Sequence, residues 1–167
     1  SLEQNGADYE LNVLFQRALA AAKRIKTDTN LSRTPLSIAT LVANKVFHFE
    51  KDGVKQVMVI GMSGKMGSTI TKNILSKPGI RVTGTYRSHK PDFVMEVKSD
   101  RVKLVEYKDR YQYMNDMDIV DSATSGPHYT VTGQELAGVL TDSRKRLFMD
   151  VAVPIDMDPE IRKFEGL

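Results

Sequence analysis

Three glycines spaced three residues apart, in the segment Gly61–Gly67, constrain the fold of this chain more than any other feature. The segment follows the short apolar run Gln56–Ile60 and precedes a stretch with helical spacing, Ser68–Leu75. A glycine-rich turn between a buried strand and a helix is typical of dinucleotide-binding domains, where phosphates lie on the free N–H groups at the helix N-terminus. The segment therefore predicts a phosphate-binding turn.

Each glycine of the turn has a separate expected role. Gly61 permits a tight turn, Gly64 lets the backbone approach a pyrophosphate, and Gly67 allows the helix to pack closely on the strand. The spacing is G-x-x-G-x-x-G, which has one residue more than the G-x-G-x-x-G pattern. Ser63 can add a hydroxyl group to the phosphate site, and Lys65 either pairs with a phosphate or points to solvent. The predicted cofactor-binding residues of the turn are Gly61, Met62, Ser63, Gly64, Lys65, Met66 and Gly67.

Short apolar strands alternate with helical patterns through the rest of the chain. We expect further strands at residues 80–85, 102–107, 118–123 and 146–153, and helices at 108–115, 133–140 and 159–164. Such alternation predicts an α/β fold, a doubly wound parallel-sheet Rossmann-type domain over residues 51–167. Two helices, one at about 9–26 and one that starts near Pro35 or Ser37 and runs to about Phe49, precede it in an N-terminal helical segment, residues 1–50. For residues 89–101 the pattern does not distinguish helix from loop.

The end of the second predicted strand indicates which cofactor binds. NAD-dependent enzymes usually place an Asp or Glu about 20 residues past the glycines, where it holds the ribose diol. This chain instead has Tyr86, Arg87 and Ser88 there, with no carboxylate between Thr85 and Lys90. An arginine can hold a 2′-phosphate through two hydrogen bonds, and a serine can donate a third. We therefore expect Tyr86, Arg87 and Ser88 to bind NADPH.

Small residues follow the strand predicted at 118–123. Ligands of such sheets bind outside the carboxyl ends of the strands, so Ala123, Thr124 and Ser125 are expected to leave room for the nicotinamide half of the cofactor. The segment Asp150–Pro154 ends the last predicted strand at the same edge. His128 lies near the expected nicotinamide, but a single loop histidine is more often structural or solvated. We predict no catalytic residue and no metal site in this chain.

Composition narrows the possible chemistry further. The chain has no cysteine, which excludes disulfides, thiolate metal sites and a cysteine nucleophile within it. A net charge of +3 over 167 residues does not indicate a dedicated nucleic-acid surface. No apolar stretch approaches the roughly 18 residues that a transmembrane helix needs. We expect a soluble, cytoplasmic protein.

Several segments together resemble glutamyl-tRNA reductases, and the resemblance covers nearly the whole chain. The turn has one residue more than the family pattern, and Tyr86 stands where the family's Asn-Arg-Thr phosphate site begins with Asn. The residues that carry the resemblance are Leu14–Ala18, Ala22–Thr29, Pro35–Ala39, Val59–Gly61 with Gly64–Gly67, Tyr86–Ser88, Asp118–Val120 with Ser122–Ser125, and Asp150–Pro154 with Asp156–Pro159.

The resemblance implies an activity for the complete protein. That family uses NADPH to reduce the glutamyl group on its tRNA to glutamate-1-semialdehyde, which starts five-carbon tetrapyrrole (porphyrin) synthesis. A cysteine in an N-terminal domain forms the thioester, and a C-terminal helical domain makes a homodimer. This chain has no cysteine and is too short for either outer domain, so we expect a cofactor-binding fragment that is inactive by itself. Contacts with glutamyl-tRNA would belong to the missing domains, and the fragment itself can be monomeric.

Two other interpretations remain open from the sequence. The chain could belong to another NADP-dependent reductase, similar to shikimate dehydrogenase or to dihydrodipicolinate reductase. It could also be a non-catalytic nucleotide-sensing domain. The turn spacing favours the comparison with dihydrodipicolinate reductase, whereas the first helical segment and the Asp150–Pro154 segment argue against it. Gly64, Arg87 and Ser125 indicate nucleotide binding, and an assay of the complete protein would separate a sensor from an enzyme.

Overall fold

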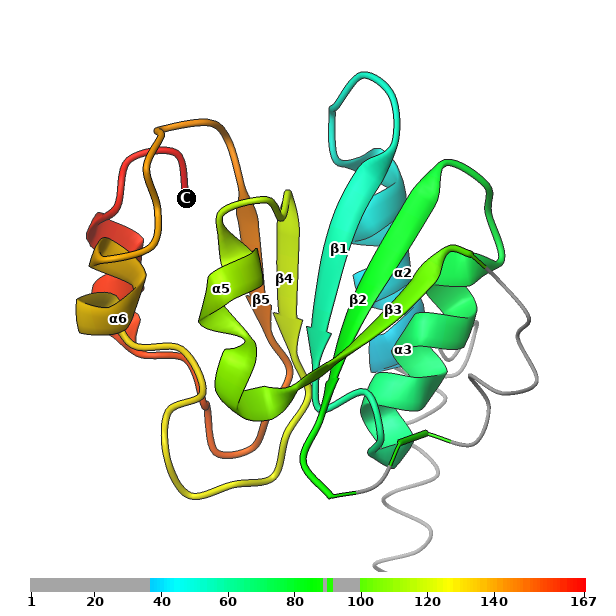
Figure 1. Ribbon diagram of the computed structural model, residues 1–167. Helices are drawn as coiled ribbons and strands as arrows, with labels where there is room; N and C mark the ends of the chain where they lie inside the picture. The colour runs from blue at the N-terminus through cyan, green and yellow to red at the C-terminus, as the bar shows by residue number, and fades with distance from the viewer. Residues whose placement is uncertain (1–36, 89, 92–99) are drawn as a thin grey trace, which may run out of the picture. The chain divides into compact units, whose positions relative to one another are not determined.

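The computed structural model describes residues 37–88, 90, 91 and 100–167 (Figure 1). The helix predicted at 9–26 and most of the segment 89–101 lie outside the described residues. The elements, in chain order, are α2 (Ile38–His48), β1 (Lys55–Ile60), α3 (Lys65–Leu75), β2 (Ile80–Tyr86), β3 (Val102–Glu106), the 3₁₀ turn η1 (Tyr107–Asp109), α5 (Tyr111–Met114), β4 (Ile119–Ser122), α6 (Gly133–Ala137), β5 (Leu147–Asp150) and the 3₁₀ helix η2 (Pro159–Lys163).

All five strands are parallel and form one sheet in the order β3-β2-β1-β4-β5. Val59 in the middle of the sheet pairs with Gly84 of β2 on one side and with Asp121 of β4 on the other. The strand order reverses between β1 and β4, which creates a crevice at the carboxyl ends of these strands. The predicted doubly wound, Rossmann-type fold is confirmed.

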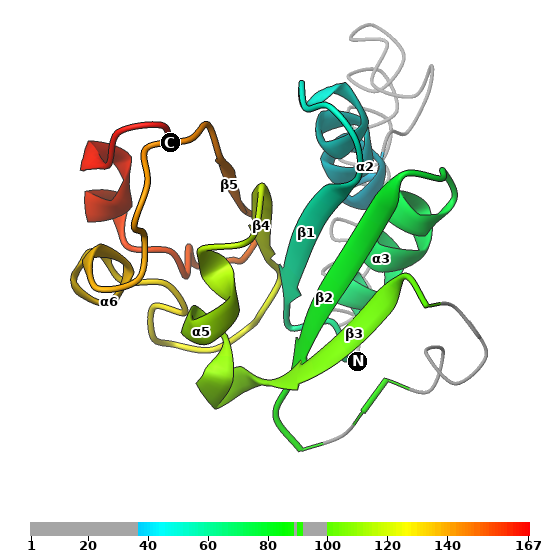
Figure 2. The same ribbon diagram turned by 45° about the horizontal axis from the view of Figure 1, so that its top comes forward.

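Two hydrophobic cores cover the two faces of this sheet (Figure 2). On one face, side chains from α2 and α3 pack against alternate residues of the strands, such as Val57 and Val59. On the other face, Met58 and Ile60 pack with residues of α5, α6 and η2. The alternation follows from the period of two residues in a strand, and it is why the buried strands read as continuous apolar runs.

The start of α2 is fixed by Ser37, whose hydroxyl oxygen accepts a hydrogen bond from the Thr40 N–H at 3.2 Å. This is the preferred way to cap the first turn of a helix. The side chains of Ala39, Val42 and Val46 are buried in the core that α2 shares with α3 and the sheet. The helix therefore packs on the sheet domain rather than apart from it.

Several elements differ in extent or type from the sequence prediction. The helix α3 begins at Lys65 rather than Ser68, and α6 ends at Ala137 rather than at residue 140. The helix predicted at 108–115 is the turn η1 followed by four residues of α5, and the helix predicted at 159–164 is the 3₁₀ helix η2. The strand predicted at 146–153 ends at Asp150. The physical reason is that the Asp150 carboxylate accepts a hydrogen bond from the Ala152 N–H at 3.0 Å, which satisfies that amide outside the sheet.

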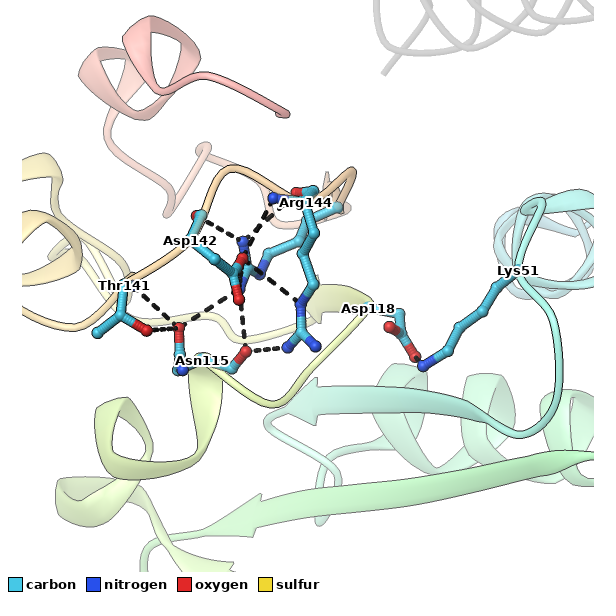
Figure 3. A network of polar contacts seen from close by, with 7 residues as sticks. Lys51, Asn115, Asp118, Thr141, Asp142 and Arg144 are labelled. Carbon is cyan, nitrogen blue, oxygen red and sulfur yellow. Dashed lines mark hydrogen bonds and ion pairs between the residues drawn. The ribbon is translucent and has the colours of Figure 1, made fainter.

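A polar network holds the opposite, amino-terminal edge of the sheet (Figure 3). The guanidinium of the buried Arg146 donates to the Asn115 carbonyl at 3.0 Å and pairs with Asp142 at 2.8 Å. Separately, the Lys51 ammonium lies 2.5 Å from the Asp118 carboxylate, which also accepts the Gln56 N–H. These contacts fix where β1, β4 and β5 begin, so that their ends meet at one edge. In the part of the chain described, no helix has the length and apolar character needed to span a membrane.

Candidate functional site

A cleft with a volume of about 490 Å³ opens at the carboxyl ends of the strands, where the strand order reverses. Its walls come from the turn after β1, the ends of β2 and β3, and the loop after β4. The lining residues are Gly61, Ser63, Gly64, Thr85, Tyr86, Arg87, Ser88, Tyr107, Ala123, Thr124, Ser125 and Gly126.

The extra residue of the glycine-rich segment is accommodated in a hydrogen-bonded turn. Gly61 has a φ of +81°, a conformation that favours glycine, and its carbonyl accepts the Gly64 N–H at 3.0 Å. The Met62 side chain is fully buried and lies against Gly84 of β2, where a Cβ would come within 2.1 Å of the Met62 methyl carbon. Ser63 lines the cleft. The longer spacing therefore leaves the cleft open.

The helix α3 begins directly after Gly64, which lines the cleft. Gly64 is the N-cap residue and supplies no side-chain hydrogen bond to the first turn. A Cβ on Gly67 would lie 2.3 Å from the Gly61 carbonyl oxygen, so only glycine allows the helix to approach the turn this closely. An uncapped helix N-terminus held beside a glycine turn can take up the negative charge of phosphate groups.

Thr85, near the end of β2, ties the turn to the neighbouring strand. Its side chain is fully buried, and its hydroxyl oxygen accepts the Gly61 N–H at 3.0 Å. The Rossmann pattern itself gives no signal for this contact. A buried threonine at the last positions of a strand, opposite a turn, could have been considered as a partner for the turn amides.

Cations lie on aromatic rings at the ends of β2 and β3. The Arg87 guanidinium carbon is 4.3 Å from the centre of the Tyr107 ring, and the guanidinium carbon of the buried Arg110 is 4.1 Å from the same ring. Arg87 itself is exposed. The Lys90 ammonium is 5.8 Å from the Tyr86 ring. Stacking of this kind orients a guanidinium while leaving its N–H groups available to a ligand.

One carboxylate stands near these cations. Glu106 ends β3 beside Tyr86 of β2, and its carboxylate pairs with the Lys108 ammonium at 2.7 Å. The hydrogen bond from Lys108, together with its charge, holds the pKa of Glu106 below its usual range. Because Lys108 already compensates this charge, Glu106 does not act as an unpaired negative group next to Arg87.

Buried polar groups form the wall after β4. The Asp156 carboxylate oxygen Oδ2 accepts hydrogen bonds from the Ser122 hydroxyl at 2.9 Å and the Thr124 hydroxyl at 2.6 Å. Asp156 is fully buried, and its other oxygen has no partner among the described residues. The Asp150 carboxylate accepts the N–H groups of Asp156 and Met157, both at 2.9 Å. The segment after β5 is thereby fixed against the end of β4.

A third carboxyl group of this region, Asp121, faces the opposite side of the sheet. It alternates with Ser122 along β4, between Val59 and Met149 in the register. Neither oxygen has a hydrogen-bond partner among the residues that the structure describes. Burial, with the charges of Asp150 and Asp156, raises the pKa of Asp121 from 3.8 to about 7. A carboxyl group in this position is more stable in its neutral form.

The predicted site residues separate into two groups in the structure. Those that line the cleft are Gly61, Ser63, Gly64, Tyr86, Arg87, Ser88, Ala123, Thr124 and Ser125. The others are placed differently: Met62 is in the core, Gly67 packs on the turn, and Lys65 and Met66 border an apolar hollow beside the start of α2. The sequence pattern did not indicate Thr85 as a tether, Tyr107 and Gly126 as lining residues, or Asp156 as a hydrogen-bond acceptor.

Comparison with protein families gives a match over most of the chain. A family model described as shikimate / quinate 5-dehydrogenase matches residues 42–167. The glutamyl-tRNA reductase of Alkaliphilus oremlandii is 36% identical over 167 residues, which is 100% of this chain and 48% of that protein. The chain therefore spans about half the length of this relative.

Solved structures show the same fold. Glutamyl-tRNA reductase from Methanopyrus kandleri has a TM-score of 0.62 at 24% identity, covering 93% of this chain and 40% of that one. The nucleotide-binding domain of glutamyl-tRNA reductase from Thermoplasma volcanium has a TM-score of 0.52 at 24% identity, covering 73% of this chain and 80% of that one. Both matches show the fold of this chain.

Proposed function

We propose that this chain, which belongs to the family described as shikimate / quinate 5-dehydrogenase, binds NADPH in its cleft and is the nucleotide-binding part of a glutamyl-tRNA reductase. The resemblance to glutamyl-tRNA reductases is confirmed by a relative that aligns with the whole chain at 36% identity. The family model begins at residue 42, whereas this relative also matches the preceding residues. That difference favours glutamyl-tRNA reductase over a shikimate dehydrogenase.

The groups of the cleft fit a phosphorylated dinucleotide. The open turn Gly61–Gly64 and the uncapped first turn of α3 suit the pyrophosphate. Arg87, at the end of β2, suits a 2′-phosphate and is the observation that carries the choice of NADPH over NADH. When bound, NADPH supplies a hydride, and the residues of this chain position the cofactor and exclude water from its nicotinamide end.

The complete protein would reduce glutamyl-tRNA to glutamate-1-semialdehyde in tetrapyrrole biosynthesis. The acceptor of the glutamyl group and the contacts with tRNA would lie outside this sequence, since the chain contains no cysteine. The homodimer would also form through parts outside it, and the protein would act in the cytoplasm. We expect the 167-residue chain to bind NADPH but to produce no aldehyde from glutamyl-tRNA.

In the first experiment the chain is titrated with NADPH and with NADH, and binding is measured by the intrinsic fluorescence of the reduced nicotinamide. The Arg87→Ala variant should bind NADPH about 10- to 100-fold more weakly, because charge-assisted hydrogen bonds to the 2′-phosphate are lost. Its affinity for NADH should not change.

A matched control is Arg81→Ala, which removes an exposed arginine of the same strand at the end away from the cleft. This variant should bind NADPH like the unmodified chain. Equal affinity of the unmodified chain for NADPH and NADH would contradict the proposed role of Arg87, and binding of neither nucleotide would favour a scaffold function.

A further inference from the structure

Arg110, which follows η1, is a buried arginine close to the cleft, and only 9% of it is exposed. Its Nε donates to the Thr130 carbonyl at 2.7 Å, and its Nη1 donates to the Tyr107 carbonyl at 3.0 Å. Its guanidinium carbon also lies 4.1 Å from the centre of the Tyr107 ring and 4.4 Å from that of the Tyr111 ring. Two carbonyl groups and two rings therefore hold this guanidinium in one place.

One of these two rings is the surface on which Arg87 rests. The Arg87 guanidinium carbon lies 4.3 Å from the centre of the Tyr107 ring. Arg110 contacts both the ring and the backbone carbonyl of Tyr107, so the ring is fixed from the protein interior. An exposed arginine has many rotamers, and ordering it around a ligand costs side-chain entropy. A fixed ring lowers this cost, because it orders the Arg87 guanidinium before a ligand binds.

The loop after β4 also lies next to Arg87. A Cβ added to Gly126 would lie 3.8 Å from the Arg87 Nη2 atom, which is ordinary van der Waals contact. Thr130, farther along this loop, is fully buried, and its hydroxyl oxygen lies 2.9 Å from that of Ser122 in a hydrogen bond. The hydrogen bond from Arg110 to the Thr130 carbonyl holds the same part of the loop. Arg110 therefore binds both structures that border Arg87, the Tyr107 ring and the loop.

We propose that Arg110 is a positioning residue for the 2′-phosphate of NADPH: it fixes the Tyr107 ring and the loop after β4, and so holds the Arg87 guanidinium where the phosphate binds. This inference rests on the proposed NADPH site. Arg110 does not belong to the described residues that line the cleft, so it acts through Arg87. Because NADH has no 2′-phosphate, its binding does not depend on Arg110.

The test is the ratio of the affinities for NADPH and NADH, measured by the nicotinamide fluorescence titration. Arg110→Met keeps a long side chain but removes the guanidinium. This variant should bind NADPH about fivefold more weakly and NADH with unchanged affinity, because Arg87 is less ordered before the phosphate arrives. When Arg87→Ala is already present, adding Arg110→Met should change neither affinity, since the residue through which Arg110 acts is gone.

Arg146→Met is the matched control. It removes another buried arginine that donates to a backbone carbonyl, that of Asn115 at 3.0 Å, at the amino-terminal edge of the sheet. Both variants should unfold at lower urea concentration than the unmodified chain, because each leaves a carbonyl without its donor. Only Arg110→Met should change the ratio of the two affinities, which separates positioning of Arg87 from a general loss of stability.

An unchanged ratio in folded Arg110→Met, or a further loss of NADPH affinity when it is added to Arg87→Ala, would overturn the role of Arg110 and leave the proposed function standing. If Arg110→Met does not fold, Tyr107→Leu decides, since it removes the ring that Arg110 holds. Its ratio should fall about threefold, and an unchanged ratio would overturn the inference. Equal affinity of the unmodified chain for NADPH and NADH would overturn both the inference and the proposed role of Arg87.

Discussion

The two halves of the cleft present their polar groups in different ways. In the β2–β3 half, formed by Tyr86, Arg87, Ser88 and Tyr107, a cation is exposed and rests on an aromatic ring. In the β4–β5 half, Thr124 lines the cleft, and Ser122, Asp150 and Asp156 lie buried or half-buried behind it. The Ser122 and Thr124 hydroxyls donate to Asp156, and the Asp150 carboxylate accepts backbone N–H groups. The first half can adjust to a ligand, whereas the second is set by the fold before a ligand binds.

The difference has an energetic consequence. Exposed ion pairs and cation–ring contacts contribute little to stability, because water screens them. A buried carboxyl group affects stability several times more strongly. It stabilises the fold where its hydrogen bonds are complete and destabilises the fold where they are not. Substitutions in the β2–β3 half should therefore change ligand affinity, and substitutions in the β4–β5 half should change stability as well.

The largest effect is expected from Asp121→Val beside the β4–β5 half. The pKa of Asp121 is about 7 in the folded chain against 3.8 as its ordinary value, so the folded state prefers the neutral form. The contribution of this group to stability is intact below about pH 4 and is lost as the pH rises to about 7. A shift of this size corresponds to about 4 kcal/mol at pH 8.

Urea unfolding of both proteins at pH 4 and pH 8 measures this effect. The free energy of unfolding of the variant minus that of the unmodified chain should be about 4 kcal/mol larger at pH 8 than at pH 4. An equal difference at the two pH values would show that Asp121 ionises normally in the fold.

Gly67→Ala should lower the free energy of unfolding by about 3 kcal/mol, because the new Cβ meets backbone atoms that have no room to move. The nearest is the Gly61 carbonyl oxygen at 2.3 Å. Gly64→Ala is the milder comparison: its Cβ would lie 3.3 Å from the same oxygen, which needs a much smaller shift, so the loss of stability should be clearly smaller. If the two variants unfold at the same denaturant concentration, the close packing of α3 on the turn is not essential.

Asp150→Ala tests whether the β4–β5 half is held from behind. Three backbone N–H groups, those of Ala152, Asp156 and Met157, lose their acceptor. We expect a loss of about 2 kcal/mol in stability and weaker NADPH binding, since Asp156 is no longer fixed. Glu160→Ala, which breaks an exposed pair with Lys163, should alter thermal unfolding by no more than about 0.5 kcal/mol.

The smallest effect is expected in the β2–β3 half, from Tyr107→Leu. Arg87 loses the ring on which it rests, and the affinity for NADPH should fall about threefold. The buried Arg110 loses the same ring, so the free energy of unfolding should also fall, by about 1 kcal/mol. Tyr113→Leu removes a comparable ring, 4.1 Å from the Lys103 ammonium, that does not line the cleft. If the loss in free energy of unfolding reaches the value of about 2 kcal/mol expected for Asp150→Ala, the β2–β3 half contributes to stability as the β4–β5 half does.

The contrast between the two halves of the cleft also explains which features could be predicted from the sequence. The fold followed from the alternation of strands and helices around Gly61–Gly67, because each of those signals is local. Residues 86–88 could be proposed as a phosphate site because they follow a strand directly. Asp156 could not be proposed as the acceptor of the Ser122 and Thr124 hydroxyl groups, since it lies 32 residues from Thr124 and 34 from Ser122 along the chain. Tyr107 reaches the cleft because β3 lies next to β2, which the spacing of residues alone does not indicate.

The hydrogen bond from the Gly61 N–H to Thr85 has a practical meaning for redesign. Thr85 anchors the glycine turn, while Tyr86, Arg87 and Ser88 follow it as a separate triplet at the cleft rim. The triplet can be exchanged without loosening the anchor, so under the proposed NADPH site the choice between NADPH and NADH would be a modular property of this domain. A laboratory seeking an NADH-dependent version would keep Thr85 and rewrite the three positions after it.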